Sequence, residues 1–172
     1  MRKIVAGFAA SVDGYIAGIH DEYDWIIIDE KIDFGEEMKR FDAFFYGRRS
    51  YEMAKSMASK PAAGTTNYVF SNTLEDVHPD FVLLKGDVKE VVSAMKQQPG
   101  KDMAVFGGAN LLASLLNLQL VDEISVSFIP VLLGSGKPMV DFLTKKVWLE
   151  FISSKRYGNG TLVVKYAVNY GG

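Results

Sequence analysis

The sequence predicts an α/β fold: one domain, residues 1–172, with a mixed and mostly parallel central sheet. Short apolar runs that fit buried strands alternate with segments of helical apolar spacing, which is typical of sheets built from strand–helix units. The last third of the chain instead joins two strand patterns across Gly158-Asn159-Gly160, and an Asn-Gly turn between strands indicates an antiparallel hairpin. No linker, internal repeat or low-complexity stretch interrupts the chain, so we expect a single domain.

The first half of the chain predicts four strands and two helices. The apolar run 4–10 ends in the turn residues 11–14, which fits a buried strand. Apolar side chains recur at roughly helical spacing among the charges of 29–41, so we expect a helix there. A second helix, 50–57, begins with a serine that suits an N-cap and ends before a loop at 61–64. The other predicted strands of this half are 43–46, 68–70 and 81–84.

The second half predicts two helices and four strands. Helical spacing runs through 88–98 and stops at Pro99-Gly100. The segment 110–118 is apolar enough for a buried helix, and 123–131 alternates as a strand does. The remaining predicted strands are 103–106, 147–153 and 161–168.

Composition and charge exclude several classes of protein. With 19 Lys and Arg against 21 Asp and Glu, the net charge of −2 gives no bulk attraction to nucleic acid. The absence of cysteine excludes disulfides, thiolate zinc sites and cysteine nucleophiles. No stretch approaches the ~18 to 20 apolar residues of a membrane span, and Asp13 interrupts the only run that resembles a signal peptide. We expect a soluble, cytoplasmic protein.

Three predicted strands end in residues suited to binding phosphate. If these strands are parallel, their carboxyl ends lie at one edge of the sheet, where open α/β sheets bind ligands. The sequence lacks G-x-G-x-x-G, so the site is not a Rossmann fingerprint. The three turns contain Gly47, Arg48, Arg49 and Ser50; Ser71, Asn72 and Thr73; and Gly107, Gly108, Ala109 and Asn110.

Each turn can be interpreted as part of a ligand site or as a purely structural feature. Gly107-Gly108 opens a helix, where backbone N–H groups and the helix dipole favour a pyrophosphate, although a glycine pair also allows tight strand-to-helix packing. Arg48 and Arg49 present guanidinium groups that suit a ribose phosphate, or they are a solvated helix start. Ser71 and Thr73 either donate hydroxyls to the same phosphate or simply form a turn. Together the turns favour a phosphorylated dinucleotide.

Asp13 and Trp25 are the residues proposed for the active-site mouth. Asp13 would supply a polar group there, although an Asp-Gly pair is first of all a turn. Trp25 is either a stacking platform or an anchor in the core or in its loop. Because hydride chemistry belongs to the cofactor, the protein needs no nucleophile.

Two other signals are discounted. One histidine among the loop carboxylates Asp21, Glu22 and Asp24 is interpreted as a solvated surface, so we expect no metal site. The run 134–137 lacks the first glycine of a phosphate loop, and Pro138 occupies its Ser/Thr position.

Six short motifs in order make the chain resemble the dihydrofolate-reductase-like proteins related to the reductase domain of bacterial riboflavin biosynthesis. These motifs lie at 10–17, 46–52, 71–74, 107–111, 121–123 and 130–136 and cover nearly the whole chain. The resemblance implies a three-layer α/β/α fold, NADPH as the cofactor, and a homodimer.

The same resemblance assigns roles to residues of the motifs. It implies adenosine-side phosphates at Gly47 to Ser50, the adenine-ribose end at Ser71 and Thr73, and the pyrophosphate at Gly107 to Asn110, with Leu111 closing that motif. Ala10, Ile16 and the loop through Trp25 would form the nicotinamide pocket. A folate reductase would also need a carboxylate after Trp25. Asp29, Glu30 and Asp33 lie nearby, but their spacing to Gly47 is too long, which argues against folate.

We therefore predict an NADPH-dependent oxidoreductase that transfers hydride to a small pterin-like or pyrimidine-like heterocycle. One alternative is the 5-amino-6-(5-phosphoribosylamino)uracil reductase of riboflavin biosynthesis, which we would expect to carry a deaminase domain as well. Another is a nucleotide-binding protein without turnover. The expected partners are the small-molecule substrate and a second copy of the chain, packed through the strand 123–131 and the segment 140–143.

Overall fold

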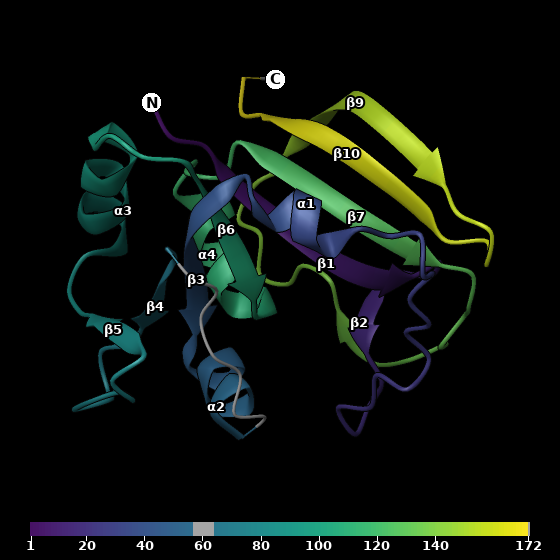
Figure 1. The fold of residues 1–172 in the computed structure, drawn as a ribbon, viewed down its shortest axis with the longest axis horizontal. Helices are drawn as coiled ribbons and strands as arrows, with labels where there is room; N and C mark the ends of the chain where they lie inside the picture. Colours follow the sequence, from purple (N-terminus) through teal and green to yellow (C-terminus); the bar gives the residue numbers. More distant parts are fainter. Residues whose placement is uncertain (57–63, 172) are drawn as a thin grey trace.

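The computed structural model describes residues 1–56 and 64–171, which form helices and strands around an eight-stranded sheet (Figure 1). The strand order is β5-β4-β3-β6-β1-β7-β10-β9, and a small second sheet pairs β2 with β8. The strands are β1 (Ile4–Ser11), β2 (Tyr15–Ala17), β3 (Phe41–Gly47), β4 (Thr66–Phe70), β5 (Phe81–Leu84), β6 (Asp102–Gly107), β7 (Glu123–Ile129), β8 (Lys137–Pro138), β9 (Trp148–Arg156) and β10 (Leu162–Asn169). The helices are α1 (Phe34–Met38), α2 (Arg48–Ser56), α3 (Val88–Gln97) and α4 (Ala109–Asn117).

The sheet is mixed, as the sequence predicts. The six strands from β5 to β7 run parallel, and β10 lies antiparallel to both β7 and β9. The loop between β9 and β10 contains the Asn-Gly pair, and Gly160 there has φ +87°, a conformation that glycine adopts without a steric cost. The predicted hairpin is confirmed.

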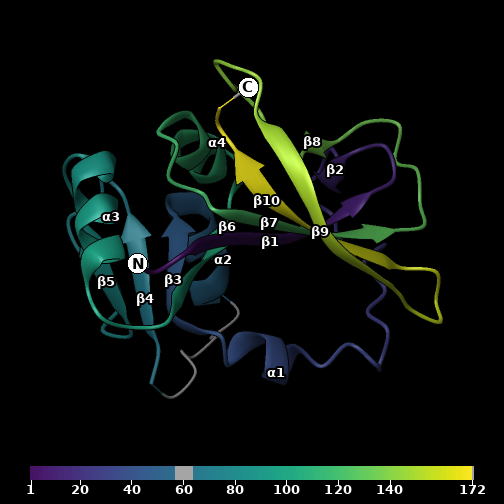
Figure 2. The same ribbon diagram turned by 90° about the horizontal axis from the view of Figure 1, so that it is seen from above.

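Helices cover both faces of the sheet. Figure 2 shows α4 on one side and α1 on the other. On the α4 side, apolar residues of α3 and α4 such as Val92 and Leu115 pack with Ile4 and Phe45 in the larger core cluster. On the opposite face, Tyr51 of α2 packs in a smaller cluster in which its ring meets that of Phe81 edge to face. Helices α2, α3 and α4 are therefore held on the sheet by burial of their apolar side chains.

The central strand β1 separates from β6 after a short seam. The two strands pair only from Ile4–Met103 to Ala6–Val105. β1 continues to Ser11 along β7, while the chain after β6 turns into α4. The sheet consequently opens between β1 and β6 at their carboxyl ends.

The first helix is shorter than the sequence predicts. The spacing predicts 29–41, whereas α1 covers Phe34–Met38 and contributes no buried residue. Asp33 stops its extension toward the N-terminus because its side chain accepts a hydrogen bond from the Glu36 N–H as an N-cap. Of the apolar residues of this segment, Ile32, Phe34 and Met38 do not pack into the core, whereas Phe41 packs there as the first residue of β3. The apolar spacing therefore indicates the wrong helix length.

Smaller differences lie at element ends. The strand at 43–46 begins at Phe41, the strand at 123–131 ends at Ile129, and the one at 147–153 continues to Arg156. The β2–β8 pair was not predicted, since β8 has only two residues. The predicted helix end at Met57 and residues 61–63 of the predicted loop lie outside the described residues.

An ion network joins the strands at the end of the sheet opposite the opening. Arg40 donates to Asp102 and Glu123, at 2.7 Å each, and Lys3 donates to Glu123 at 2.6 Å. Burial raises the pKa of the Glu123 carboxyl, but the hydrogen bonds from Arg40 and Lys3 outweigh it, so the pKa lies below its ordinary value.

Candidate functional site

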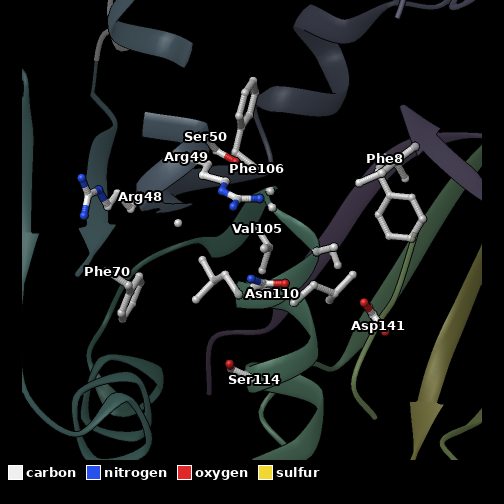
Figure 3. A pocket seen from close by; sticks show the side chains of 18 of the residues that line it. Phe8, Arg48, Arg49, Ser50, Phe70, Val105, Phe106, Asn110, Ser114 and Asp141 are labelled. Atoms are coloured by element: carbon white, nitrogen blue, oxygen red, sulfur yellow. The ribbon is translucent and has the colours of Figure 1, made fainter. Parts of the chain in front are cut away.

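A cleft of about 1160 Å³ lies at the carboxyl ends of β3, β4 and β6 (Figure 3). Its volume exceeds the usual ~300 to 1,000 Å³ of a small-molecule pocket. It lies where the sheet opens between β1 and β6, and both strands line it. Parallel sheets bind ligands at such positions because the strand ends and helix N-termini point at one place.

One end of the cleft collects hydroxyl and guanidinium groups. Arg48 is the first residue of α2, directly after β3, and its Nη1 donates to Thr73 Oγ1 at 3.2 Å. Its Nε donates to Glu52 Oε1 at 2.8 Å, which fixes the guanidinium plane. Ser71 Oγ accepts hydrogen bonds from the backbone N–H groups of Thr73 and Leu74. The cluster presents donors suited to an anion.

The two arginines occupy different parts of the cleft. Figure 3 shows Arg48 on the side of Phe70 and Arg49 nearer the middle, beside Ser50. Among residues 1–56 and 64–171, no hydrogen-bond partner holds the Arg49 guanidinium, which leaves its donors available to a ligand.

The β6–α4 turn brings backbone close to backbone. Gly107 has φ +127°, and a Cβ at this position would lie 3.2 Å from Ser50 Oγ. A Cβ at Gly47 would lie 3.7 Å from the Gly108 nitrogen, so the ends of β3 and β6 are close together. Helix α4 starts at Ala109 without a side-chain cap or an acidic residue in its first turn. Its free N–H groups and dipole therefore favour an anion.

The opening between β1 and β6 forms the apolar part of the cleft. Phe8, Val105 and Phe106 line it, and Gly7 has no heavy atom within 4 Å of where a Cβ would lie. A flat ring fits between such walls better than a charged group, because the polar groups that line it are few. Asn110 and Asp141 lie on the α4 side of this part (Figure 3).

Most residues that the sequence predicts for the cofactor line this one cleft. These residues are Ile16, Gly47, Arg48, Arg49, Ser50, Ser71, Gly107, Gly108, Ala109, Asn110 and Leu111. Thr73 lies one hydrogen bond away, at Arg48. Ala10 does not line the cleft, since it is fully buried in the core cluster.

The two residues predicted for the active-site mouth do not line the cleft. The Asp13 carboxylate accepts hydrogen bonds from the backbone N–H groups of Leu133 and Gly134, the latter at 2.7 Å. A hydrogen bond from Ser11 is the main cause that holds the pKa of Asp13 below its usual value. Trp25 is half-buried and donates from Nε1 to the Glu22 carbonyl at 3.2 Å, within its own loop.

Several cleft residues were not predicted. Lys85 follows β5 as Ser71 follows β4, so the same strand-end pattern contained the signal for it. Phe8 and Phe70 lie within strands, and Met139 and Asp141 come from the segment after β8, where no local motif marks them. Lys137 also lines the cleft, paired with Asp21.

No metal centre emerges within the described residues, where no three His, Asp or Glu side chains are grouped to hold an ion. Glu22 accepts from the backbone N–H of His20, inside the loop interpreted as a solvated surface. In the part of the chain that the structure describes, no helix is long and apolar enough to cross a membrane.

Known structures share this fold. A Shewanella sp. PV-4 protein named for riboflavin biosynthesis superposes with a TM-score of 0.86 at 24% identity, over 97% of this chain and 99% of the other. Dihydrofolate reductase from Enterococcus faecalis, complexed with NADP(H), superposes with a TM-score of 0.70 at 14% identity, over 97% and 96% of the chains. These likenesses show that the chain has a dihydrofolate-reductase-like fold.

The chain can also be assigned to one family. The model of the RibD C-terminal domain matches residues 2–163, and the chain belongs to this family. It is also 30% identical over 180 residues to the uncharacterized protein YyaP of Bacillus subtilis (strain 168), covering 98% of this chain and 96% of that protein. The predicted resemblance and fold class are confirmed.

Proposed function

We propose that the protein is an NADPH-dependent reductase that transfers hydride to a small pterin-like or pyrimidine-like heterocycle. One observation carries the proposal: the ends of β3, β4 and β6 bring Arg48, Ser71 and Gly107-Gly108 to a single cleft that continues into the opening beside β1. Membership of the RibD C-terminal domain family supports it. The cytoplasmic location stays a prediction from the sequence.

The residues present fit a phosphorylated dinucleotide. Arg48 with the Ser71 and Thr73 hydroxyls would hold a ribose phosphate, because a fixed guanidinium and two hydroxyl groups converge there. Because Gly107 and Gly108 carry no side chain, a pyrophosphate would be able to approach the first N–H groups of α4. The apolar opening beside Phe8 and Phe106 would take the nicotinamide ring.

When bound, NADPH supplies the hydride, and the chain's own residues orient the reactants. Gly7, Phe8 and Phe106 would give the reacting rings mostly apolar neighbours. The open space over Gly7 admits a second flat ring beside the first. Asp13 is not assigned a proton, because its lowered pKa and its bonds to the 133–134 loop keep it ionised.

The test is a pair of measurements on the purified protein. Fluorescence titration should show saturable binding of NADPH that is tighter than that of NADH. Steady-state NADPH oxidation should then be measured with dihydrofolate, 5-amino-6-(5-phosphoribosylamino)uracil and simpler oxidised pterins and pyrimidines. Oxidation with at least one of these heterocycles is expected.

Different failures have different meanings. Tight NADPH binding with no oxidation by any heterocycle would favour the alternative of a nucleotide-binding protein without turnover. Equal, weak binding of both cofactors would contradict the assignment of the strand-end cluster itself.

A further inference from the structure

The cleft has a mostly apolar floor on the face of the sheet that α2 covers. Val5 packs in the smaller core cluster on this face, so Gly7 and Ala9 further along β1 face the same side. The ring centroid of Phe106 lies 4.9 Å from that of Tyr46, another member of this cluster. A Cβ at Gly7 would meet no heavy atom within 4 Å, so the floor has open space above it. A flat ring fits this part of the cleft.

Tyr23 is the polar side chain beside this floor. It comes from the segment between β2 and α1 and lines the cleft together with Ile26. Its hydroxyl donates to Met53 Sδ of α2 at 3.2 Å, so the ring lies on the side of the sheet that α2 covers. Because a thioether is a weak acceptor, the hydroxyl can exchange this bond for a stronger one to a ligand. The side chain is 44% exposed, so water also reaches it.

Hydrogen bonds hold the segment that carries Tyr23. The carbonyl of Glu22 accepts from Trp25 Nε1 at 3.2 Å, and the carbonyl of Tyr23 itself accepts from a backbone N–H three residues on. Further along, Asn159 of the β9–β10 turn donates from Nδ2 to the Ile27 carbonyl at 2.9 Å. A side chain on a segment held in this way loses less conformational entropy when it binds a ligand. Trp25 is therefore an anchor of the loop that presents Tyr23.

The other titratable side chains that line the cleft, within residues 1–56 and 64–171, are poorly suited to give a proton at this floor. Asp21 and Lys137 form an ion pair with each other. The two arginines keep their protons in proteins. Lys85 follows β5, which three strands separate from β1, and Asp141 lies on the α4 side (Figure 3). Tyr23 is the group that remains.

We propose that Tyr23 donates the proton that accompanies hydride transfer, to the nitrogen or oxygen of a C=N or C=O bond in the substrate ring. The inference rests on the proposed function. The carbon of this bond takes the hydride from the nicotinamide, which is oxidised, and the neighbouring heteroatom takes the proton from Tyr23 Oη. The phenolate then regains a proton from water. The substrate is thus a flat ring whose reducible bond lies with its heteroatom toward α2.

The first test removes the proton and keeps the ring. Tyr23→Phe should lower kcat for reduction of the heterocycle about 10²- to 10⁴-fold, the usual contribution of a positioned proton donor. The KM of the heterocycle should rise only about 2- to 13-fold, the loss of one neutral hydrogen bond. The dissociation constant of NADPH, measured by fluorescence titration, should stay the same, because Tyr23 lies away from the phosphate-binding turns.

Tyr157→Phe is the matched control. Tyr157 lies between β9 and β10 and does not line the cleft, so this variant should keep the kcat of the wild type. An unchanged kcat in Tyr23→Phe, or a change in KM alone, would overturn the proposal. An equal fall in kcat in both variants would do the same.

The second test detects the contact without turnover. In protein made with fluorinated tyrosine, the fluorine resonance of Tyr23 is identified by its loss in Tyr23→Phe. Oxidised pterins and pyrimidines are then added to the protein with NADP⁺, a pair that cannot react because both molecules are oxidised. The Tyr23 resonance should shift, and the Tyr157 resonance should not.

The two tests separate this inference from the proposed function. A shift at Tyr23 without NADPH oxidation by any heterocycle would contradict the reductase and still place the ring at Tyr23. Reduction of a heterocycle that leaves the Tyr23 resonance in place would support the reductase and overturn the inference. No shift with any heterocycle would also overturn it.

Discussion

Arg48 and Arg49 are neighbours in sequence, but their side chains differ in position and in hydrogen-bond partners. Arg48 is held by Glu52 and Thr73, beside the Ser71 hydroxyl. Arg49 extends into the cleft without a bonded partner among the described residues. A 2′-phosphate distinguishes NADPH from NADH, and a held guanidinium loses less conformational entropy when it binds one. This arrangement favours Arg48 as the residue that selects the cofactor.

Replacement of Arg48 should weaken the binding of NADPH much more than that of NADH. A hydrogen bond to a charged group contributes about 1.5 to 3 kcal/mol, so Arg48→Ala should weaken NADPH roughly 10- to 150-fold and hardly change NADH. Fluorescence titration of both cofactors measures the difference, with Arg49→Ala as the matched variant. If Arg49→Ala shows the selective loss instead, the 2′-phosphate lies nearer the middle of the cleft. Equal losses for both cofactors would contradict either assignment.

At the scale of elements, the β6–α4 turn and strand β1 differ in whether they require a glycine. Gly107 has positive φ, and a Cβ there would lie 3.2 Å from Ser50 Oγ, whereas a Cβ at Gly7 would meet no heavy atom within 4 Å. Gly107→Ala should lower the free energy of unfolding by about 1 to 3 kcal/mol, since a side chain is strained in that conformation. Gly7→Ala should change stability by less than about 1 kcal/mol. Urea denaturation compares the two, and equal effects would show that the turn does not require glycine.

The segment before α1 bears on substrate choice. Asp29 accepts from the backbone N–H groups of Lys31 and Asn159, at 2.9 and 3.0 Å, and those bonds lower its pKa, that from Lys31 most. Asp33 caps α1. Both carboxylates therefore bind their own chain, and neither lines the cleft in which a pterin would bind.

Dihydrofolate should consequently be a poor substrate. Steady-state NADPH oxidation with dihydrofolate is expected to be weak or absent, well below the ~10⁴ M⁻¹s⁻¹ at the lower end of usual enzyme efficiency. Turnover above that level would show that another group, such as the exposed Glu30, recognises the pterin.

The elements show where sequence patterns suffice. The strand ends at Gly47, Ser71 and Gly107 were predictable because a strand–turn–helix boundary is a local pattern, and parallel strands bring such boundaries together. The length of α1 was not predictable, because the apolar residues of this helix are not buried in the core. Asp141 also escaped prediction, because its place in the cleft depends on how the chain after β8 returns to the sheet. Asp13 sits at the predicted turn, but only the fold shows its carboxylate bonded to a loop 120 residues away.

At the scale of the molecule, the ion network fixes the closed end of the sheet. Glu123 joins Arg40, before β3, to Lys3, before β1. Its lowered pKa stabilises the fold at pH values above the ordinary carboxyl range, and that contribution is lost as the pH falls through the lowered value.

Removal of the Glu123 charge should reduce stability at neutral pH more than at acid pH. Glu123→Gln should cost about 1 to 3 kcal/mol at pH 7, because it removes the negative charge that Arg40 and Lys3 share and replaces one of the two acceptor oxygens by an amide donor. The difference from wild type should shrink as the pH is lowered toward 3. Thermal unfolding across this range measures it, and a difference independent of pH would show that the carboxylate charge is not what stabilises the network.

Because β1 and β6 pair only over Ile4–Ala6, this short ladder alone joins the two parts of the sheet. A ligand bound in the opening contacts both parts of the sheet, and so connects β1 and β6 where no hydrogen bonds join the two strands. Because it binds only the assembled form, NADPH at 100 times its dissociation constant should add about 2.7 kcal/mol to the free energy of unfolding. Amide exchange should slow on both sides of the opening, at Gly7 and at Gly107. Slowing on one side alone would mean that the ligand contacts only one part of the sheet.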